Sequence, residues 1–331
     1  MSNPIFIARQ DTLENDILPA HWLLQYKLFG EESYTFQDKE IWKKLCMSRA
    51  AANDRDMHAE ALEEMLTTFS AEHTGKWMLL VYGMDAAELN GLATMAAVAG
   101  NGTAMAAVAG NALLMHAITN SQTAMHAIAN SETAMQRIAN STTAMDAIGG
   151  SKIARDAVQA SPYYDAKIKE NDMAIAKLVV GFANLESARY SGCAGMAADS
   201  TAMTAVAASS TAMTAVAASA TAMGKIAAVD AALSKLAAST TAMDALYARK
   251  KQMKGGSASK SGKFIILEIS QSNAFNTSKY GYATLSDGSK PDWSSYLAKY
   301  AFFQKYPKYA TYMLNDTDSD DYIYYFDIAS P

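Results

Sequence analysis

The stretch TAMTAVAASSTAMTAVAASATAM, from Thr201 to Met223, returns to the same letters every ten residues. An earlier block keeps the same spacing: a methionine recurs every ten residues from Met95 to Met145, and each is followed three residues later by valine or isoleucine. Half of the chain's 20 methionines lie in register with this repeat. Self-similarity at a fixed period predicts a repeat architecture, because one such unit is too small to bury its apolar side alone.

Each repeat has the pattern of a short helix. Methionine and the branched residue that follows it lie three positions apart between alanines, which places both on one face over about two turns of α-helix. A continuous helix cannot keep that face, since ten residues fall about 80° short of three turns. Asn-Ser pairs such as Asn130-Ser131 separate the repeats with residues that favour turns and helix N-caps. The sequence therefore predicts short helices that stop and restart, with Gly149-Gly150 as a further break.

The large residues of the repeat are expected in a shared core. A helix of about seven residues is well below the ~12–15 residues needed for stability on its own, so it must pack on neighbouring repeats or on other chains. A methionine stripe can also bind partners, but Leu233 stands in one of the methionine positions, as a core position allows. The residues expected in this core include Met105, Val108, Met125, Ile128, Met135, Ile138, Met203, Val206, Met213 and Val216.

Composition divides the chain into the regions of a mixed, mainly α protein. Aromatic residues gather toward the two ends, whereas alanine dominates the repeats. We expect a globular α+β domain at 1–84, repeat blocks at 85–150 and 201–248, an interrupted helical segment at 151–200, a flexible linker at 249–263, and a small β-rich domain at 264–331. Within the interrupted segment, DAKIKENDMAIAKLVVGFANLESARY predicts one longer amphipathic helix. The linker, RKKQMKGGSASKSGK, is predicted from its glycine, serine and basic residues.

Charge and cysteine content argue against several classes of protein. A net charge of −5 gives no broad attraction for nucleic acid. The basic linker has no aromatic residue for base stacking, so we interpret it as a solvated hinge. The start, MSNPIFIARQDTLEND, lacks the pattern of a secretion signal, and no apolar run is long enough to predict a membrane span. Cys46 and Cys193 indicate neither a disulfide framework nor a zinc site.

No pattern of residues predicts catalysis. The chain has no nucleophile, metalloprotease or phosphate-loop motif, so we expect no enzyme, cofactor or metal. His116 and His126 occupy the same repeat position and would form a metal-binding or proton-sensitive ladder if chains stacked in register, but a solvent-facing role is favoured. The aspartates between Asp316 and Asp327 weakly resemble a calcium loop. The glycine and glutamate of that loop are missing, which favours a charged turn between strands.

The C-terminal region predicts a contact surface. It begins with FIILEIS, a strand-like run, and Asp287-Gly288 indicates a turn. Tyrosine is dense in this region, and tyrosine gives a large contact area with few rotatable bonds to order. Core packing is expected to take about half of the aromatic residues. The candidate receptor-binding residues are Tyr280, Tyr282, Trp293, Tyr296, Tyr322 and Tyr324.

A globular head, a repeat region rich in alanine, threonine and serine, and an aromatic end together resemble a tail fibre or baseplate-attached receptor-binding protein of a tailed bacteriophage or related contractile particle. Repeats of the STAMTAVAAS type are similar to segments of phage-encoded tail proteins, and the likeness covers roughly 85–248. The resemblance implies a homotrimer in the virion tail or baseplate, assembled in the host cytoplasm. Residues 1–84 would attach to tail or baseplate proteins, the repeats would form a shaft, and 264–331 would be a tip that binds a host surface glycan or protein.

Two alternatives belong to other classes. One is a monomeric repeat-solenoid scaffold or adhesin, in which the short helices pack on one another within one chain. The other, less favoured, is a tailspike-type glycosidase with a carboxylate pair in the C-terminal region. The mass of the chain in solution separates the first alternative from a trimeric fibre.

Overall fold

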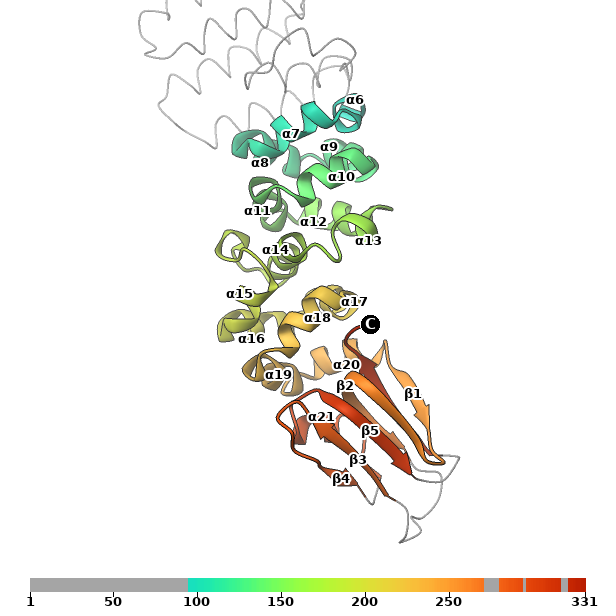
Figure 1. Ribbon diagram of the computed structural model, residues 1–331. Helices are drawn as coiled ribbons and strands as arrows, with labels where there is room; N and C mark the ends of the chain where they lie inside the picture. Colours follow the sequence, from blue (N-terminus) through green and yellow to red (C-terminus); the bar gives the residue numbers. More distant parts are fainter. Residues whose placement is uncertain (1–94, 271–279, 294–295, 317–320) are drawn as a thin grey trace, which may run out of the picture. The chain divides into compact units, whose positions relative to one another are not determined.

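The computed structural model describes residues 95–270, 280–293, 296–316 and 321–331. The α+β domain expected at 1–84 lies outside the described residues. The described chain is mixed, mainly helical, with one antiparallel six-stranded sheet (Figure 1). It divides into two compact units, which meet in sequence between Ile168 and Lys169.

The described part of the first unit, residues 95–168, is a series of short helices that follow the ten-residue spacing (Figure 1). They are α6 (Met95–Gly100), α7 (Gly102–Gly110), α8 (Ala112–Asn120), α9 (Gln122–Ala129), α10 (Glu132–Ala139), α11 (Thr142–Gly150), α12 (Lys152–Gln159) and α13 (Tyr164–Lys167). The repeat pattern thus continues beyond the expected boundary at residue 150 and includes α12. The predicted break at Gly149-Gly150 is the end of α11.

The helices from α6 to α10 each pack against the third helix after them. α6 contacts α9, α7 contacts α10, α8 contacts α11, α9 contacts α12, and α10 contacts α13. Three repeats therefore complete one turn of a superhelix. Because every repeat is a separate helix with its own direction, the methionine face does not need to follow the 3.6-residue period from one repeat to the next. The ten-residue period is one third of a superhelical turn.

The repeats bury their large residues within one chain. All ten residues expected in the core, from Met105 to Val216, have no exposed surface. The alanines that precede the methionines, such as Ala104 and Ala134, are buried as well, which allows close approach of neighbouring helices. The solenoid thereby meets the packing requirement of each short helix without a second chain.

A serine at several of the junctions joins successive turns of the superhelix. The Ser131 hydroxyl accepts a hydrogen bond from the Ala134 amide at 3.2 Å and donates one to the Ala99 carbonyl, three repeats earlier, at 2.6 Å. The last carbonyls of a helix have no hydrogen-bond partner within that helix. This hydroxyl therefore caps the N-terminus of one helix and donates a hydrogen bond to a free carbonyl at the C-terminus of another. The same pair of bonds recurs at Ser141 and Ser151.

The second unit begins with helices that stack in the same way. They are α14 (Asp172–Phe182), the 3₁₀ helix η1 (Ser187–Arg189), α15 (Cys193–Ala198), α16 (Ser200–Ala208), α17 (Ser210–Ala218), α18 (Ala220–Ala227), α19 (Asp230–Ala237) and α20 (Thr240–Tyr247). α14 contacts α17, α15 contacts α18, α16 contacts α19, and α17 contacts α20. The serine link is present here too, since Ser239 donates to the Ala207 carbonyl at 2.5 Å.

The single longer helix predicted within 151–200 is not formed. The segment contains α13 and α14, and α14 begins only after Asn171, whose side chain caps it by accepting from the Ala174 amide at 3.1 Å. The prediction was wrong because Asn171 was counted as a polar position of a continuous helix rather than as an N-cap. The buried Lys177 of α14 donates to the Ser187 carbonyl at 3.1 Å and so anchors the irregular stretch that follows.

The C-terminal part of the second unit is the sheet, with strand order β1-β6-β2-β5-β3-β4. Its elements are β1 (Lys251–Lys254), β2 (Ala258–Ser270), β3 (Tyr280–Leu285), β4 (Asp292–Trp293), helix α21 (Ala301–Lys305), β5 (Ala310–Asp316) and β6 (Tyr322–Asp327). The long β2 pairs with β5 through its first half and with β6 through its second half. The halves meet at Gly262, where φ is +152° and a side chain would collide with the Phe264 ring. One core, which includes Phe264, Trp293 and Phe302, joins both halves.

The flexible linker expected at 249–263 is instead part of the sheet. Its residues form β1 and the first part of β2, which pair with β6 and β5. Glycine and serine supply the turn between them, where Gly256 and Ser257 both have positive φ. The prediction was wrong because the pairing partners lie at the far end of the chain, where a local reading of composition does not detect them.

Candidate binding surface

The candidate tyrosines lie in separate parts of the sheet. Tyr282 of β3 is half-buried and packs against Tyr312 of β5, with ring centroids 5.7 Å apart. Tyr296 follows β4 and is 50% exposed. Tyr322 and Tyr324 lie on β6, three strands away from β3 in the sheet order. The structure therefore brings Tyr322 and Tyr324 together and separates them from Tyr282.

Trp293 is a core residue. It is only 3% exposed, and its ring packs edge-on against Phe302 with centroids 5.7 Å apart. Gly281 is its register partner on β3, and a side chain at this glycine would collide with the indole. The prediction that Trp293 contacts a receptor is therefore wrong, because the ring fills the space that the glycine leaves. Tyr280 begins β3, one residue before this glycine.

Tyr322 and Tyr324 share one face of β6, because side chains alternate along a strand. Both are half-buried, and their rings are nearly parallel, with 23° between the planes and 6.2 Å between centroids. On the edge strand β1, Lys254 is the register partner of Tyr322, and Gln252 is that of Tyr324. An exposed lysine and an exposed glutamine therefore lie beside the two rings.

The end of α20 adds a third ring to this surface. The Tyr247 ring lies 6.4 Å from that of Tyr324, and its hydroxyl donates to Glu268 of β2 at 2.5 Å. Burial and the bond to Glu268 raise the pKa of Tyr247, so its hydroxyl stays protonated as a donor. The Lys250 ammonium lies 4.0 Å from the centre of the Tyr247 ring and 5.7 Å from that of Tyr324, within cation–π range.

We call this surface the tyrosine–lysine platform, and it consists of Tyr247, Lys250, Gln252, Lys254, Tyr322 and Tyr324. Sequence reasoning missed the contribution of Tyr247 and of the basic residues. One signal was present: Tyr247 occupies the repeat position that Ala207, Ala217 and Ala237 hold elsewhere. The basic stretch was interpreted as a hinge because it contains no aromatic residue, whereas the structure supplies its aromatic neighbours from β6.

Polar contacts fix the sheet on the last two repeat helices. The Lys299 ammonium lies 3.1 Å from an Asp244 oxygen of α20, and the Tyr300 hydroxyl donates to the same carboxylate. Lys308 contacts Asp230 of α19 at 2.6 Å. The bonds from Tyr300 and Lys299 lower the pKa of Asp244. The sheet thus closes the end of the helical stack, where an uncovered turn would expose its apolar residues.

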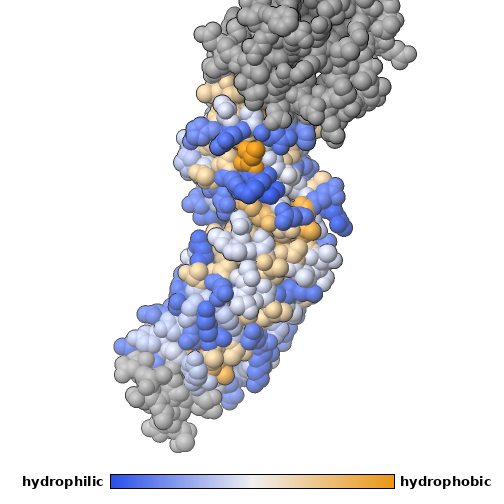
Figure 2. Space-filling model, turned by 180° about the vertical axis from the view of Figure 1, so that it is seen from behind, coloured by the Kyte–Doolittle hydropathy of each residue, from blue (hydrophilic) through white to orange (hydrophobic). Residues whose placement is uncertain are grey.

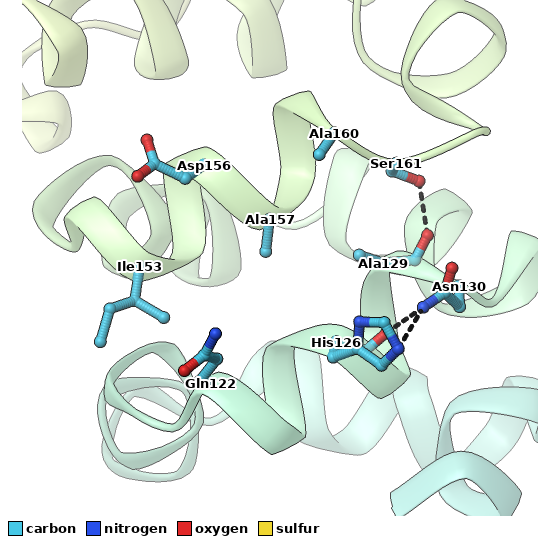
Figure 3. A pocket seen from close by; sticks show the side chains of 9 residues that line it. All are labelled: Gln122, His126, Ala129, Asn130, Ile153, Asp156, Ala157, Ala160 and Ser161. Carbon is cyan, nitrogen blue, oxygen red and sulfur yellow. Dashed lines mark hydrogen bonds between the residues drawn. The ribbon is translucent and has the colours of Figure 1, made fainter.

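A pocket of about 450 Å³ lies between α9 and α12 of the first unit (Figure 3). Its lining combines small residues, among them Ala129 and Ala157, with a polar rim. The Asn130 side chain lies 3.1 Å from the His126 ring and so occupies one ring nitrogen. Asp156 is paired with Lys152 at 2.5 Å. The pocket has room for a small polar molecule. Ser161 and His126 both line it, but the Ser161 hydroxyl donates to the Ala129 carbonyl and not to the histidine ring.

The histidine ladder considered for chains stacked in register is not formed by packing within the described part of the chain. His116 and His126 are exposed on successive helices, whereas helices stack three repeats apart. In the calcium-like segment, Asp318 and Asp320 lie outside the described residues. Asp316 accepts a hydrogen bond from Ser257, and Asp327 contacts Lys251 at 3.4 Å. No group of metal-binding side chains occurs in the described part of the chain.

The described surface has few large apolar side chains. Among the residues whose burial the structure describes, Ile153 and Tyr296 are the large hydrophobic residues that are exposed, at 42% and 50%. Figure 2 shows one face on which small apolar patches are interspersed with hydrophilic residues. No single described helix is long and apolar enough to cross a membrane. α16 and α17 pass that test only as a pair, and they are bent by 101° at their junction.

Comparison with known proteins adds no relative: no family model matches this sequence, and no curated protein matches it.

Proposed function

We propose that the chain is an attachment protein of a virus tail or related particle, in which the repeats act as a spacer and the C-terminal sheet contacts the host surface. The observation that carries this proposal is the platform at the closed end of the helical stack. Three tyrosines and two lysines meet there from α20, β1 and β6, and all of them retain exposed surface. Exposed tyrosine is typical of contact surfaces.

The proposal does not depend on a trimer. The sequence argument for partner chains was that each short helix must bury its methionine and isoleucine, and the repeats achieve this within one chain. A homotrimer of the kind that the resemblance implies would form through other surfaces. Attachment to tail or baseplate proteins by residues 1–84 is part of the proposal and rests on the resemblance alone.

A monomeric repeat-solenoid scaffold is the second candidate, and the intramolecular packing favours it. Stacks of short repeats commonly present extended binding surfaces along their length. The two functions differ in where the partner binds. An attachment protein uses the sheet, whereas a scaffold uses the exposed side of the repeats.

Binding of the full-length chain to a panel of bacterial cells tests the proposal. One variant replaces Tyr296, Tyr322 and Tyr324 by serine. A matched variant replaces three exposed repeat residues, Thr201, Thr211 and Thr214, by alanine. We expect the tyrosine variant to lose binding and the threonine variant to keep it. Loss only in the threonine variant would favour the scaffold, and no binding of the unmodified chain to any cell would refute the proposed function.

A further inference from the structure

We propose that the tyrosine–lysine platform binds an acidic oligosaccharide, whose sugar rings bear carboxylates. This inference rests on the proposed function, and it specifies which chemical class of surface molecule the sheet recognises. It depends on two properties of the platform, which are the row of tyrosine rings and the free positive charge beside them.

The three tyrosines form a continuous row. Tyr322 and Tyr324 are 6.2 Å apart, and Tyr247 continues the row 6.4 Å beyond Tyr324. Tyr322 and Tyr324 each offer an apolar surface and a hydroxyl, a combination that suits a sugar ring with its C–H groups and hydroxyls. The Tyr247 hydroxyl is bonded to Glu268, and the Lys250 and Lys299 ammonium groups lie over its ring, so Tyr247 holds positive charge beside the other two rings. The exposed amide of Gln252 lies beside this row and can both donate and accept. A row of rings fits a chain of sugar units better than one isolated sugar.

The cations of the platform are available for an anionic ligand. Lys250 and Lys254 of the platform and the adjacent Arg249 are exposed, and none of them forms an ion pair within the described residues. The neighbouring acids are engaged: Glu268 accepts from Tyr247, and Asp244 accepts from Tyr300 and Lys299. The next basic residue, Lys251, contacts Asp327 and the Ser330 carbonyl.

The charge of the whole chain limits the kind of anion that fits. Its net charge is −5, so the chain as a whole does not attract polyanions. A nucleic acid carries one phosphate per nucleotide along its length and would be repelled beyond the platform. An acidic oligosaccharide of a few units places its carboxylates only where the lysines are. Lys250 and Lys254 would then form charge-assisted hydrogen bonds to them.

A matched pair of ligands tests the role of charge. Calorimetry with the full-length chain would compare oligogalacturonate with the same oligomer after methyl esterification, which keeps the sugar chain and removes the charge. Heparin fragments and oligosialic acid would extend the acidic set, and a thymidine oligonucleotide would test nucleic acid. We expect at least one acidic sugar to bind, its ester or neutral form to bind about tenfold more weakly, and salt to weaken the binding.

Variants locate the binding on the platform. Lys250→Gln with Lys254→Gln should weaken binding of the acidic sugar about tenfold, and Tyr322→Ala with Tyr324→Ala should abolish it. The lysines are exposed, so their replacement is expected to preserve the fold. Tyr282→Ala is the matched control, because this tyrosine is equally half-buried but lies three strands away.

Three results would overturn the inference: equal affinity for the acidic and esterified sugar, unchanged affinity in the lysine variant, or binding of the oligonucleotide in preference to every acidic sugar. Failure of all acidic sugars to bind would overturn it as well. If the chain nevertheless binds cells through the sheet, the proposed function survives and only the ligand class is wrong. If it binds neither cells nor sugars, both fail.

Discussion

The repeats and the sheet use the same chain in opposite ways. In the repeats, each contact joins helices three units apart and recurs from one unit to the next, so the interactions that Ser131 makes are those that Ser141 makes. In the sheet, the first strand pairs with the last, as Lys251 does with Tyr325, and no contact repeats. The repeats gain stability by adding equivalent units, whereas the sheet depends on single positions such as Gly262 and Gly281, each of which accommodates one particular ring. Insertion or deletion of a whole repeat should therefore be tolerated in the repeats. A substitution that changes the shape of a side chain in the core should be poorly tolerated in the sheet.

Deletions test this difference most strongly. Removal of one repeat, residues 131–140, joins Asn130 to Ser141 and restores a normal junction, so the chain should fold with little loss of stability. Removal of residues 131–135 takes away the capping serine and Met135 but keeps the rest of α10. We expect this shorter deletion to lower the free energy of unfolding by more than about 4 kcal/mol, because it breaks the ten-residue spacing of the buried side chains. Urea unfolding of both variants measures the difference, and equal stability of the two would contradict the repeat account.

The methionine positions should accept other residues of similar volume. Met213→Ala should destabilise the chain by about 2–5 kcal/mol, since its side chain is fully buried. Met213→Leu should cost less than about 1.5 kcal/mol, because Leu233 already fills the equivalent position. Thermal unfolding measures both. If alanine is tolerated as well as leucine, Met213 is not a core residue.

The hydrogen bonds of the junction serines predict that one substitution lowers the stability of the chain and that another raises it. Ser141→Ala removes an N-cap and the bond to the Ala109 carbonyl, and should cost about 1–3 kcal/mol. Val229 caps α19 without a side-chain bond, so Val229→Ser should stabilise the chain by about 0.5–2 kcal/mol. Chemical denaturation of the two variants in parallel measures whether the free energy of unfolding falls in the first and rises in the second. A neutral Ser141→Ala variant would show that the link contributes nothing.

Substitutions at two glycines, one in the repeats and one in the sheet, allow a direct comparison of the two regions. A side chain at Gly224 in α18 meets nothing within 4 Å, so Gly224→Ala should stabilise the repeats by about 0.5–1 kcal/mol. Gly281→Ala places a methyl group against the Trp293 ring and should destabilise the sheet by about 1–3 kcal/mol. Differential scanning calorimetry distinguishes the two effects, and the same sign in both would contradict the account.

The smallest predicted effect is a pH dependence at the contact between α20 and the sheet. The pKa of Asp244 is lowered in the folded chain by Tyr300 and Lys299. A carboxylate of this kind contributes its full stability above its ordinary pKa and loses it as the pH falls through the folded value. Thermal melts should therefore show a steeper acid loss in the unmodified chain than in Asp244→Asn. Tyr300→Phe should reduce the difference, and identical profiles for all three proteins would refute this role.

The sequence predicted the repeats well and the sheet only in part, since the strand at FIILEIS and the turn at Asp287-Gly288 are confirmed but the first strand was missed. Short helices, their Asn-Ser junctions and the burial of methionine follow from local spacing and capping chemistry, which a single repeat already contains. The choice between packing within one chain and between chains does not follow from spacing. The strand β1 and the burial of Trp293 depend on residues far away in sequence. The β1 segment was therefore interpreted as part of a linker, and Trp293 was interpreted as a contact residue. For the candidate surface, Tyr322 and Tyr324 were predicted, but their neighbours on α20 and β1 were not.

The ten-residue repeat builds a solenoid within one chain. The most direct test is the midpoint of thermal unfolding, followed by helical circular dichroism of the full-length chain over about a hundredfold range of concentration. Intramolecular packing predicts the same midpoint at every concentration. A midpoint that rises with concentration would show that the repeats bury their methionines between chains, and it would contradict the account.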